Sequence, residues 1–400
     1  MRTKQLMPLT VFAFAYFLGA CSGVKFSQHY DCEQDGSCIV TGGVAQYSAQ
    51  EVTVGGGKVD ILIVDDNSAS MSYEQERMAA RFGQFIKNLD NKYMDYRIAF
   101  TTTDISSSQN AARSINQNGA LQDGNLIALS NGKKYLSSTD GDLAQKTQIF
   151  NDVIKRPETL ACENFIRNWI SSNKSINNST YSTEYYNNCP SGDERGIYAA
   201  NLVLQNNPDS FLRDDADFQV IFLSDEDERS QLYSSQSAYA LTEMDLGKNF
   251  AQNIRAKFPS KNFGVHSIIV ADSYCLPLQS QQLLNVVSGS YGYEYDNARK
   301  EAQSIINLER SSKGLSSVNM VLGDICSNDY SGQLQNIFDE VSGPIVDNIA
   351  LKCANPQNLN VTVATNDSSV SYEVVGNVIQ FNKKLPVGTK VSVSTYTCDE

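Results

Sequence analysis

Oxygen-bearing side chains gather in three short segments of this 400-residue sequence, and their types are those that bind hard metal ions. The segments are residues 65–71 (DDNSASM), 191–194 (SGDE) and 224–228 (SDEDE). Carboxylates that pack together repel one another unless a cation neutralises them. Oxygen ligands favour magnesium, manganese or calcium over zinc or copper. If the three segments meet in space, they predict a divalent-cation site.

The neighbouring segments indicate how they would meet. Residues 59–64 (VDILIV) and 218–223 (FQVIFL) are short apolar runs, typical of strands buried on both faces of a parallel sheet. The first and third acidic segments follow these runs directly, and the second precedes a helical pattern, ERGIYAANLVL. Ligands in open α/β sheets bind beyond the carboxyl ends of the strands, so we expect the segments to converge there.

The wider pattern alternates strands with helices. Further strands are expected at residues 96–100, 263–270 and 318–322, with amphipathic helices between them. Such alternation predicts a doubly wound, mainly parallel α/β sheet over residues 58–349, with helices on both faces. Residues 350–400 change to period-two patterning with turn signals and predict a small antiparallel β unit.

At this point the sequence resembles a known family. Asp66-x-Ser68-x-Ser70, directly after a buried strand and before Met71 and an amphipathic helix, resembles the metal-ion-dependent adhesion site (MIDAS) of von Willebrand factor type A (VWA) domains. FQVIFLSDEDE resembles the strand that carries the family's metal-site aspartate, here Asp225. The resemblance covers roughly residues 58–349 and extends, in FLRDDADFQVIFLSDEDERS, to a bacterial lipoprotein branch.

The resemblance implies a specific set of ligands. Two serine hydroxyls would contact Mg²⁺, or alternatively Mn²⁺ or Ca²⁺, while the aspartates act mostly through water. One coordination position would stay open for an acidic side chain of a partner. The family usually has a threonine where this sequence has Glu194; Thr102 or Thr103 would substitute only if their loop folds inward. A carboxylate there would bind the cation more tightly but leave it less electrophilic, which favours calcium or manganese.

Plainer interpretations remain open at each position. The DDNSAS segment also fits a turn with a serine N-cap. SDEDERS alone fits a solvated acidic loop, and Glu194 fits an exposed carboxylate stabilised by a helix dipole.

The N-terminal residues predict export and a lipid anchor. Arg2 and Lys4 precede an apolar run too short to span a bilayer as a permanent helix, so residues 1–20 are expected to be a signal peptide. The run ends in Leu-Gly-Ala-Cys21, which resembles a bacterial lipobox, with Ser22 favouring the outer membrane. The alternative is an ordinary secretory signal. Residues 21–57 are expected to form a tether with a small disulfide loop.

Cysteine usage fits an oxidising compartment. Eight of the nine cysteines remain when Cys21 is set aside. The sequence contains no CxxC motif, the pattern that would suggest a metal cluster. Spacing favours pairing between sequence neighbours, although the sequence leaves other connectivities open. The favoured pairs are Cys32–Cys38, Cys162–Cys189, Cys275–Cys326 and Cys353–Cys398.

Composition narrows the function. A net charge of -13 makes nucleic acid an unfavourable partner. Of two histidines, His29 falls in the expected tether and His266 in an expected strand, so a Ser-His-Asp triad lacks its base. We therefore expect a non-enzymatic envelope protein that binds a protein or glycan ligand through a cation. The alternatives are a structural lipoprotein with a stabilising metal and a glycoside hydrolase that uses two carboxylates.

Overall fold

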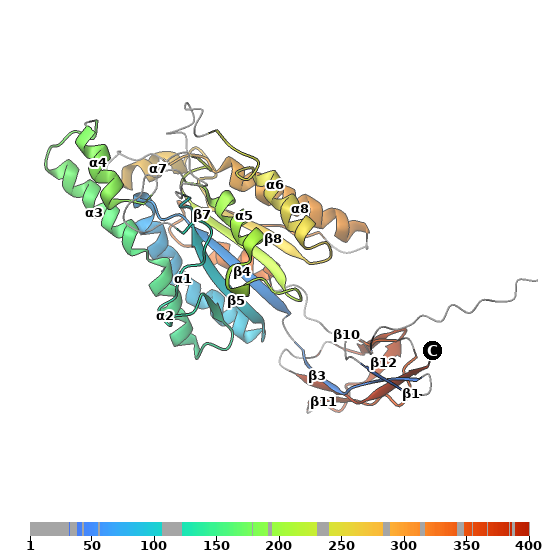
Figure 1. Ribbon diagram of the computed structural model, residues 1–400. Helices are drawn as coiled ribbons and strands as arrows, with labels where there is room; N and C mark the ends of the chain where they lie inside the picture. The colour runs from blue at the N-terminus through green and yellow to red at the C-terminus, as the bar shows by residue number, and fades with distance from the viewer. Residues whose placement is uncertain are drawn as a thin grey trace, which may run out of the picture.

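The computed structural model describes the chain from residue 32 to residue 399 with gaps. The described residues are 32, 38–41, 44–54, 57–105, 122–177, 179–190, 194–229, 240–282, 289–312, 317–341, 348–353, 355–365, 367–383, 385 and 389–399. The expected signal peptide and lipidated Cys21 lie outside them. Figure 1 shows a large part of helices and strands and a smaller part made of strands. Among the described residues, no helix combines the length and apolar character needed to cross a membrane.

The large part is built on one six-stranded sheet. Its strands follow the order β6 (Tyr135–Ser137), β5 (Asp95–Thr102), β4 (Lys58–Asp65), β7 (Asp217–Ser224), β8 (Phe263–Ile269) and β9 (Leu322–Asp324). The contacts from β5 to β9 are parallel, whereas β6 runs antiparallel to β5. β4 is buried beyond its first residue, and its apolar run accordingly lies at the centre of the sheet.

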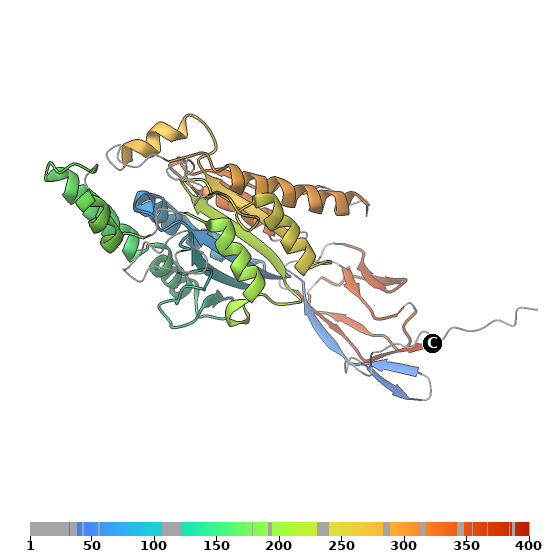
Figure 2. The same ribbon diagram turned by 45° about the horizontal axis from the view of Figure 1, so that its top comes forward.

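Helices cover both sides of this sheet (Figures 1 and 2). On one side, α1 (Ser72–Asn91), α2 (Leu143–Ile154) and α9 (Ser331–Val341) contribute to one buried apolar cluster. On the other, α5 (Gly196–Asn206), α6 (Gly247–Lys257) and α8 (Tyr293–Ser312) contribute to a second cluster. The short η3 (Pro208–Ser210) follows α5, and α7 (Cys275–Gln282) follows β8.

A helical hairpin extends past one end of the sheet, where Figure 1 shows it in green. It consists of α3 (Pro157–Ser171) and α4 (Ser179–Asn188), joined by the Cys162–Cys189 disulfide. α3 packs against the short helix η2 (Ala69–Met71), which lies within the first acidic segment. The hairpin is therefore placed to hold that segment.

The expected fold class is wrong for the chain as a whole. The protein is a mixed α/β structure with one six-stranded mixed sheet and three small antiparallel sheets, not a doubly wound parallel sheet followed by one small β unit. The small sheets have the strand orders β1-β2-β15, β10-β13-β12 and β11-β14-β3. The pairs β2–β15 and β3–β14 join strands from opposite ends of the sequence and leave no local signal, which explains why the pattern of residues did not predict them.

The small part also takes residues from both ends of the sequence. N-terminal strands β1 (Cys38–Thr41), β2 (Val44–Tyr47) and β3 (Gln50–Thr53) join C-terminal strands, with β2 beside β15 (Tyr396–Asp399) and β3 beside β14 (Lys390–Val393). The remaining strands are β10 (Asn348–Ala350), β11 (Val361–Val363), β12 (Tyr372–Val375) and β13 (Val378–Phe381). Strands β1, β2 and β3 are thus part of a folded β structure, where a tether was expected. The rings of Tyr47 and Tyr396 stack with centroids 5.3 Å apart, so apolar contacts add to the strand pairing.

The disulfide pairing favoured by spacing is confirmed. The structure joins Cys32–Cys38, Cys162–Cys189, Cys275–Cys326 and Cys353–Cys398. Two of these bonds belong to the small part and two to the large part, so each part is cross-linked within itself.

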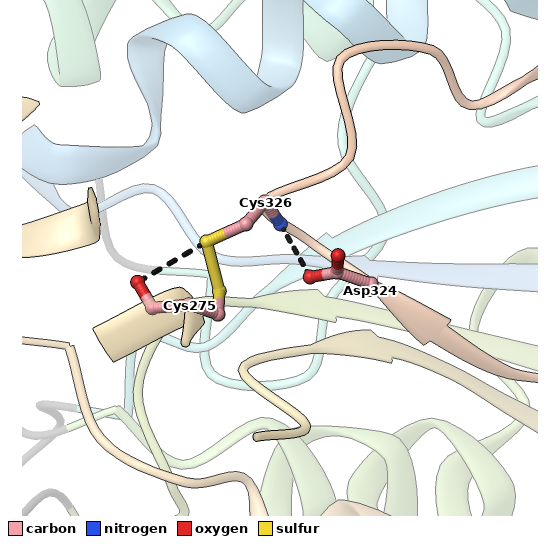
Figure 3. Close-up of side chains that lie close together, drawn as sticks. All are labelled: Cys275, Asp324 and Cys326. Atoms are coloured by element: carbon pink, nitrogen blue, oxygen red, sulfur yellow. Dashed lines mark hydrogen bonds between the residues drawn. A yellow bond between two sulfur atoms is a disulfide. The ribbon is translucent and has the colours of Figure 1, made fainter. Parts of the chain in front are cut away.

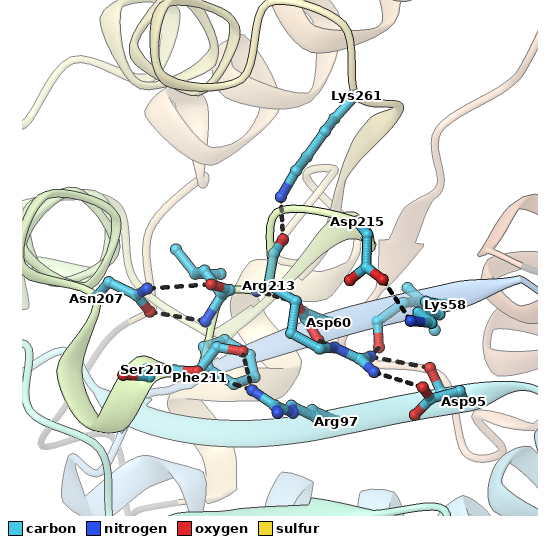
Figure 4. Close-up of polar contacts among 12 residues, drawn as sticks. Lys58, Asp60, Asp95, Arg97, Asn207, Ser210, Phe211, Arg213, Asp215 and Lys261 are labelled. Atoms are coloured by element: carbon cyan, nitrogen blue, oxygen red, sulfur yellow. Dashed lines mark hydrogen bonds and ion pairs between the residues drawn. The ribbon is translucent and has the colours of Figure 1, made fainter. Parts of the chain in front are cut away.

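A network of ion pairs stabilises the end of the sheet at which β4 begins (Figure 4). Arg213 donates from Nε to Asp60 Oδ1 at 2.8 Å and from its backbone nitrogen to Asp60 Oδ2 at 2.7 Å. Its guanidinium also pairs with Asp95 at 2.8 Å. These contacts give the FLRDD segment a structural role, since one arginine joins the starts of β4 and β5 to the loop before β7.

Candidate metal centre

Strand register brings the first and third acidic segments together. In the parallel pair β4–β7, Asp65 lies opposite Leu223, and the backbone nitrogen of Asp66 donates to the Leu223 carbonyl at 3.0 Å. The side chain of Ser224 then reaches across, and its Oγ donates to Asp66 Oδ2 at 2.7 Å. The two segments therefore meet at the carboxyl ends of adjacent central strands, as expected.

Within the first segment, a tight turn places both serine hydroxyls beside Asp225. The Ser68 backbone nitrogen donates to Asp66 Oδ1 at 2.8 Å, and η2 follows at once. Ser68 Oγ and Ser70 Oγ lie 3.0 Å apart, and Ser70 Oγ donates to Asp225 Oδ1 at 3.1 Å. Four of the five expected ligands thus form one connected group.

Burial and mutual repulsion disfavour the ionised form of the carboxyl groups at this position. Asp66 and Asp225 are 0% and 1% exposed. Burial raises the pKa of Asp225 well above its usual range, and the nearby Asp66 and Glu226 carboxyls raise it further. Among the described residues, Asp225 Oδ2 has no hydrogen-bond partner. Ionised carboxylates without partners are costly to bury, so a cation bound here would remove a penalty. The donor set of hydroxyls and carboxylates fits Mg²⁺, Mn²⁺ or Ca²⁺.

Glu194 lies at the same edge and is buried. It forms an isolated β-bridge with Asp104 and is only 2% exposed, which excludes the interpretation as a solvated carboxylate at a helix start. Burial raises the pKa of Glu194 well above its usual range, and the negative charges of Glu226 and Asp66 raise it further. Its Oε2 has no hydrogen-bond partner in the part of the chain that the structure describes. Glu194 therefore adds negative charge near Asp66, although the carboxylates of Glu194, Asp66 and Asp225 do not all lie within 4.8 Å of one another.

Thr102 and Thr103, the threonine alternatives, lie buried at the end of β5 and in the turn that follows it. Thr102 Oγ1 accepts a hydrogen bond from the Asp104 backbone nitrogen at 3.3 Å, within the turn after β5. The Thr103 carbonyl accepts from the Arg195 backbone nitrogen at 2.9 Å. This turn thus holds the chain that leads into α5, and it presents Glu194 to the site.

Asp227 and Glu228, two acidic residues of the third segment, bind the N-termini of helices. Asp227 Oδ1 accepts from the Glu294 backbone nitrogen at 2.9 Å, at the start of α8. Glu228 accepts from the Ile197 and Tyr198 backbone nitrogens at 2.8 and 3.1 Å, at the start of α5. A carboxylate at a helix N-terminus satisfies free N–H groups and the helix dipole. The segment is therefore not a solvated acidic loop.

A second layer of side chains, which the sequence reasoning missed, supports the turn. Gln75 Nε2 donates to the Asp66 carbonyl at 3.0 Å, and Thr159 Oγ1 donates to the Asn67 carbonyl at 2.8 Å. Asn67 Nδ2 donates to Asp104 Oδ2 at 2.8 Å. These contacts join α1, α3 and the turn after β5, and no local sequence signal connects such distant residues.

Two other groups of side chains have structural roles instead of a role in metal binding or catalysis. Among the described residues, Cys275, Asp324 and Cys326 form a group of three carboxylate and sulfur side chains whose ligand atoms lie within 4.8 Å of one another, but Figure 3 shows that the two sulfurs form a disulfide. A disulfide offers no thiolate for a metal. His266 is fully buried and accepts from the Val321 backbone nitrogen at 3.1 Å, which fits a core histidine. His29 lies outside the described residues.

Comparison with known proteins identifies no family. No protein-family model matches the sequence, and no curated protein is significantly similar to it. Solved structures that align with this chain include the pilus adhesin SpaC of Lactobacillus rhamnosus GG. In its open conformation it is 12% identical with a TM-score of 0.33, over 90% of this chain and 41% of that one. A second SpaC structure is 13% identical with a TM-score of 0.35, over 90% and 44%.

The type V pilus tip protein Mfa5 of Porphyromonas gingivalis is 12% identical with a TM-score of 0.28. That match covers 88% of this chain and 63% of Mfa5. The chain thus spans less than two thirds of each of these structures. Such low TM-scores indicate only a loose likeness of fold, so no function is transferred from these proteins.

Proposed function

We propose that this protein binds a protein or glycan ligand through a divalent cation, in adhesion or in assembly of a bacterial envelope. The ion would be held by Asp66, Ser68, Ser70 and Asp225, with Glu194 as a further contributor. When bound, it would neutralise the buried carboxylates and offer a positive centre to an acidic group of the ligand. The likeness of Asp66-x-Ser68-x-Ser70 to the MIDAS of VWA domains supports this proposal.

One observation carries the proposal. Ser70 Oγ lies within hydrogen-bond distance of both Ser68 Oγ and Asp225 Oδ1, at 3.0 and 3.1 Å, although Ser70 and Asp225 are 155 residues apart. The other oxygen of Asp225 is buried without a hydrogen-bond partner among the described residues. Native proteins rarely leave such an atom unsatisfied, and a bound ion is one of the ordinary explanations.

An envelope location is part of the same proposal. The four disulfides fit a chain that folds in an oxidising compartment. The lipobox-like segment that ends at Cys21 supports a lipid anchor in the outer membrane. Labelling with radioactive palmitate, compared between the wild type and Cys21→Ala, tests the anchor separately from the metal site.

Calorimetry tests cation binding. The mature chain should bind one Mg²⁺, Mn²⁺ or Ca²⁺ ion, and Asp66→Ala should abolish the heat of binding because it removes a carboxylate from the group. Asp152→Ala, which removes an exposed carboxylate from α2, is the matched control and should bind normally. Full affinity in Asp66→Ala would refute the assignment.

Burial favours one alternative, a cation that only stabilises the loops. Ser68 and Ser70 are just 7% and 5% exposed, so access to the ion is narrow. A pull-down from envelope extracts separates the two functions. Capture that disappears with chelator and in Asp66→Ala supports cation-dependent binding. A melting temperature that rises with metal, together with capture that ignores chelator, supports the stabilising role.

A further inference from the structure

Tyr295 is a fully buried tyrosine that the sequence reasoning did not single out. It belongs to the first turn of α8 and is 0% exposed. Its ring packs against that of Phe222 in β7, with centroids 4.9 Å apart. The Ser267 hydroxyl of β8 donates to the Tyr295 carbonyl at 3.0 Å. The position of the phenol is therefore fixed by packing against β7 and by a hydrogen bond from β8.

The hydroxyl of Tyr295 lies against the start of α5, the helix that follows Glu194. A Cβ atom placed on Gly196 would lie 2.8 Å from this hydroxyl oxygen and 3.2 Å from Cγ1 of Val64 in β4. Glu194 is two residues before Gly196, and Asp66 is two residues after Val64. The hydroxyl is thus next to both of the chain segments that supply Glu194 and Asp66.

The hydroxyl keeps its proton in these surroundings. Burial raises the pKa of Tyr295 well above its usual range, and the negative charges of Glu228 and Asp66 raise it further. Asp227 and Glu194 act in the same direction. A protonated phenol beside carboxylates is a hydrogen-bond donor for their oxygens.

A donor and an acceptor without partners lie at this segment. Among the described residues, the Tyr295 hydroxyl has no hydrogen-bond partner, and neither has Oε2 of Glu194, although both atoms are buried. Buried polar atoms in native proteins are nearly always bonded, either to the protein or to ordered water. One buried water, which typically makes about three hydrogen bonds, would satisfy both atoms.

The other carboxyls around Tyr295 already have partners. Glu228 accepts from two backbone nitrogens at the start of α5, and Asp227 accepts from one at the start of α8. Both oxygens of Asp66 accept hydrogen bonds as well. Of these four carboxyls, Glu194 is the one with a buried oxygen left to satisfy, and this selects it as the partner of Tyr295.

We propose that Tyr295 is a positioning residue whose hydroxyl, through one buried water, holds the Glu194 carboxylate in place beside the cation. This inference rests on the proposed function, because it assigns a support to one of the proposed contributors. A hydrogen-bonded carboxylate keeps one orientation, and outer partners of this kind raise metal affinity. The phenol then contributes to cation binding without contacting the ion.

A double-mutant cycle on the mature chain tests this inference, with Mn²⁺ affinity measured by calorimetry. Tyr295→Phe removes only the hydroxyl and should weaken Mn²⁺ binding about tenfold, as the loss of an outer partner of a metal ligand commonly does. In the Glu194→Met background the acceptor is missing, so Tyr295→Phe should cause no further loss.

Tyr96→Phe is the matched control. Tyr96 is equally buried at the beginning of β5, and its hydroxyl donates to Asp90 Oδ1 at 2.9 Å. Loss of this bond should lower the urea midpoint, because it leaves the Asp90 carboxylate with one donor fewer. The Mn²⁺ affinity of Tyr96→Phe should equal that of the wild type.

The outcomes separate this inference from the proposed function, because urea midpoints of the same variants are also measured with chelator. When the wild type binds Mn²⁺, an equal loss of affinity from Tyr295→Phe in both backgrounds, or no loss in either, overturns the positioning role. If the wild type binds no cation, the proposed function fails and the midpoints decide. Additive effects of Tyr295→Phe and Glu194→Met on the midpoint then overturn the water-bridged pair, whereas coupled effects support it.

Discussion

At the scale of single residues, the partners of a carboxyl group decide what it does. Asp225, Asp227 and Glu228 stand almost side by side in the sequence and are all buried or nearly so. The oxygens of Asp227 and Glu228 accept from helix N-termini, whereas one oxygen of Asp225 lacks a partner among the described residues. The sequence predicted an acidic cluster but could not distinguish these roles, because the donors come from α5 and α8.

Arg213 provides a prediction about stability. Arg213→Met should lower the free energy of unfolding by about 3–5 kcal/mol, since it leaves the carboxyl of Asp60 buried without its charged partner. Asp60 is 1% exposed, and burial already raises its pKa above the usual value despite Arg213. Urea denaturation provides the measurement. Lys58→Met, which breaks an exposed pair with Asp215, should cost less than about 1 kcal/mol. Equal costs would contradict this account.

His266 predicts a pH dependence. Burial lowers its pKa from 6.5 to about 3, so the folded protein keeps the ring neutral where the unfolded chain binds a proton. The stability linked to His266 is therefore complete above pH 6.5 and is lost progressively as the pH falls toward 3. Between these values, the free energy of unfolding should fall more steeply in the wild type than in His266→Gln. Urea titrations at several pH values measure this free energy. An equal fall with pH in the wild type and in His266→Gln would exclude this role.

At the scale of elements, the apolar runs predicted the central strands well. The expected strands at 59–64, 96–100, 218–223 and 263–270 correspond to β4, β5, β7 and β8. The strand expected at 318–322 is present but displaced toward the C-terminus, because β9 begins only at Leu322. Val318 and Met320 instead bond to Asn307 and Gln303 of α8 through their backbone nitrogens. Period alone cannot distinguish such an apolar coil from a strand.

The helical hairpin predicts a link between a disulfide and the metal site. Replacing Cys162 and Cys189 by alanine should destabilise the fold by about 2–4 kcal/mol, because the bond closes a loop over a separation of 27 residues. The double replacement should also weaken cation binding, because the disulfide packs against Ala69, which lies between Ser68 and Ser70 in the sequence. Calorimetry gives the cation affinity. The matched pair Cys32→Ala and Cys38→Ala, in the small part, should leave that affinity unchanged; a similar loss in both would contradict the link.

At the scale of the whole molecule, the main surprise is that the two ends of the chain fold together. β2 and β3 complete sheets whose other strands include β15 and β14, more than 300 residues later in the sequence. Sequence patterning predicted β structure near the C-terminus but could not show that β1, β2 and β3 belong to it. Contacts over such separations are costly to form and slow folding, so the small part is expected to form late.

This arrangement predicts the effect of a truncation. A chain that starts at residue 57 lacks β3 and β2, which pair with β14 and β15, so the small part should lose its order and become sensitive to protease. The large part has its own core and disulfides, and it should resist digestion. Limited proteolysis followed by mass spectrometry distinguishes the two parts. Protection of residues 348–399 in the truncated chain would show that the N-terminal strands are dispensable.

The most direct measurement of the central claim is the position of a bound ion. Crystals of the mature chain soaked in Mn²⁺ should give one strong anomalous peak within ligand distance of the Ser68 and Ser70 hydroxyls and beside Asp225, and the peak should be absent from Asp225→Ala crystals. A peak only at other residues, or none at saturating Mn²⁺, would contradict the account.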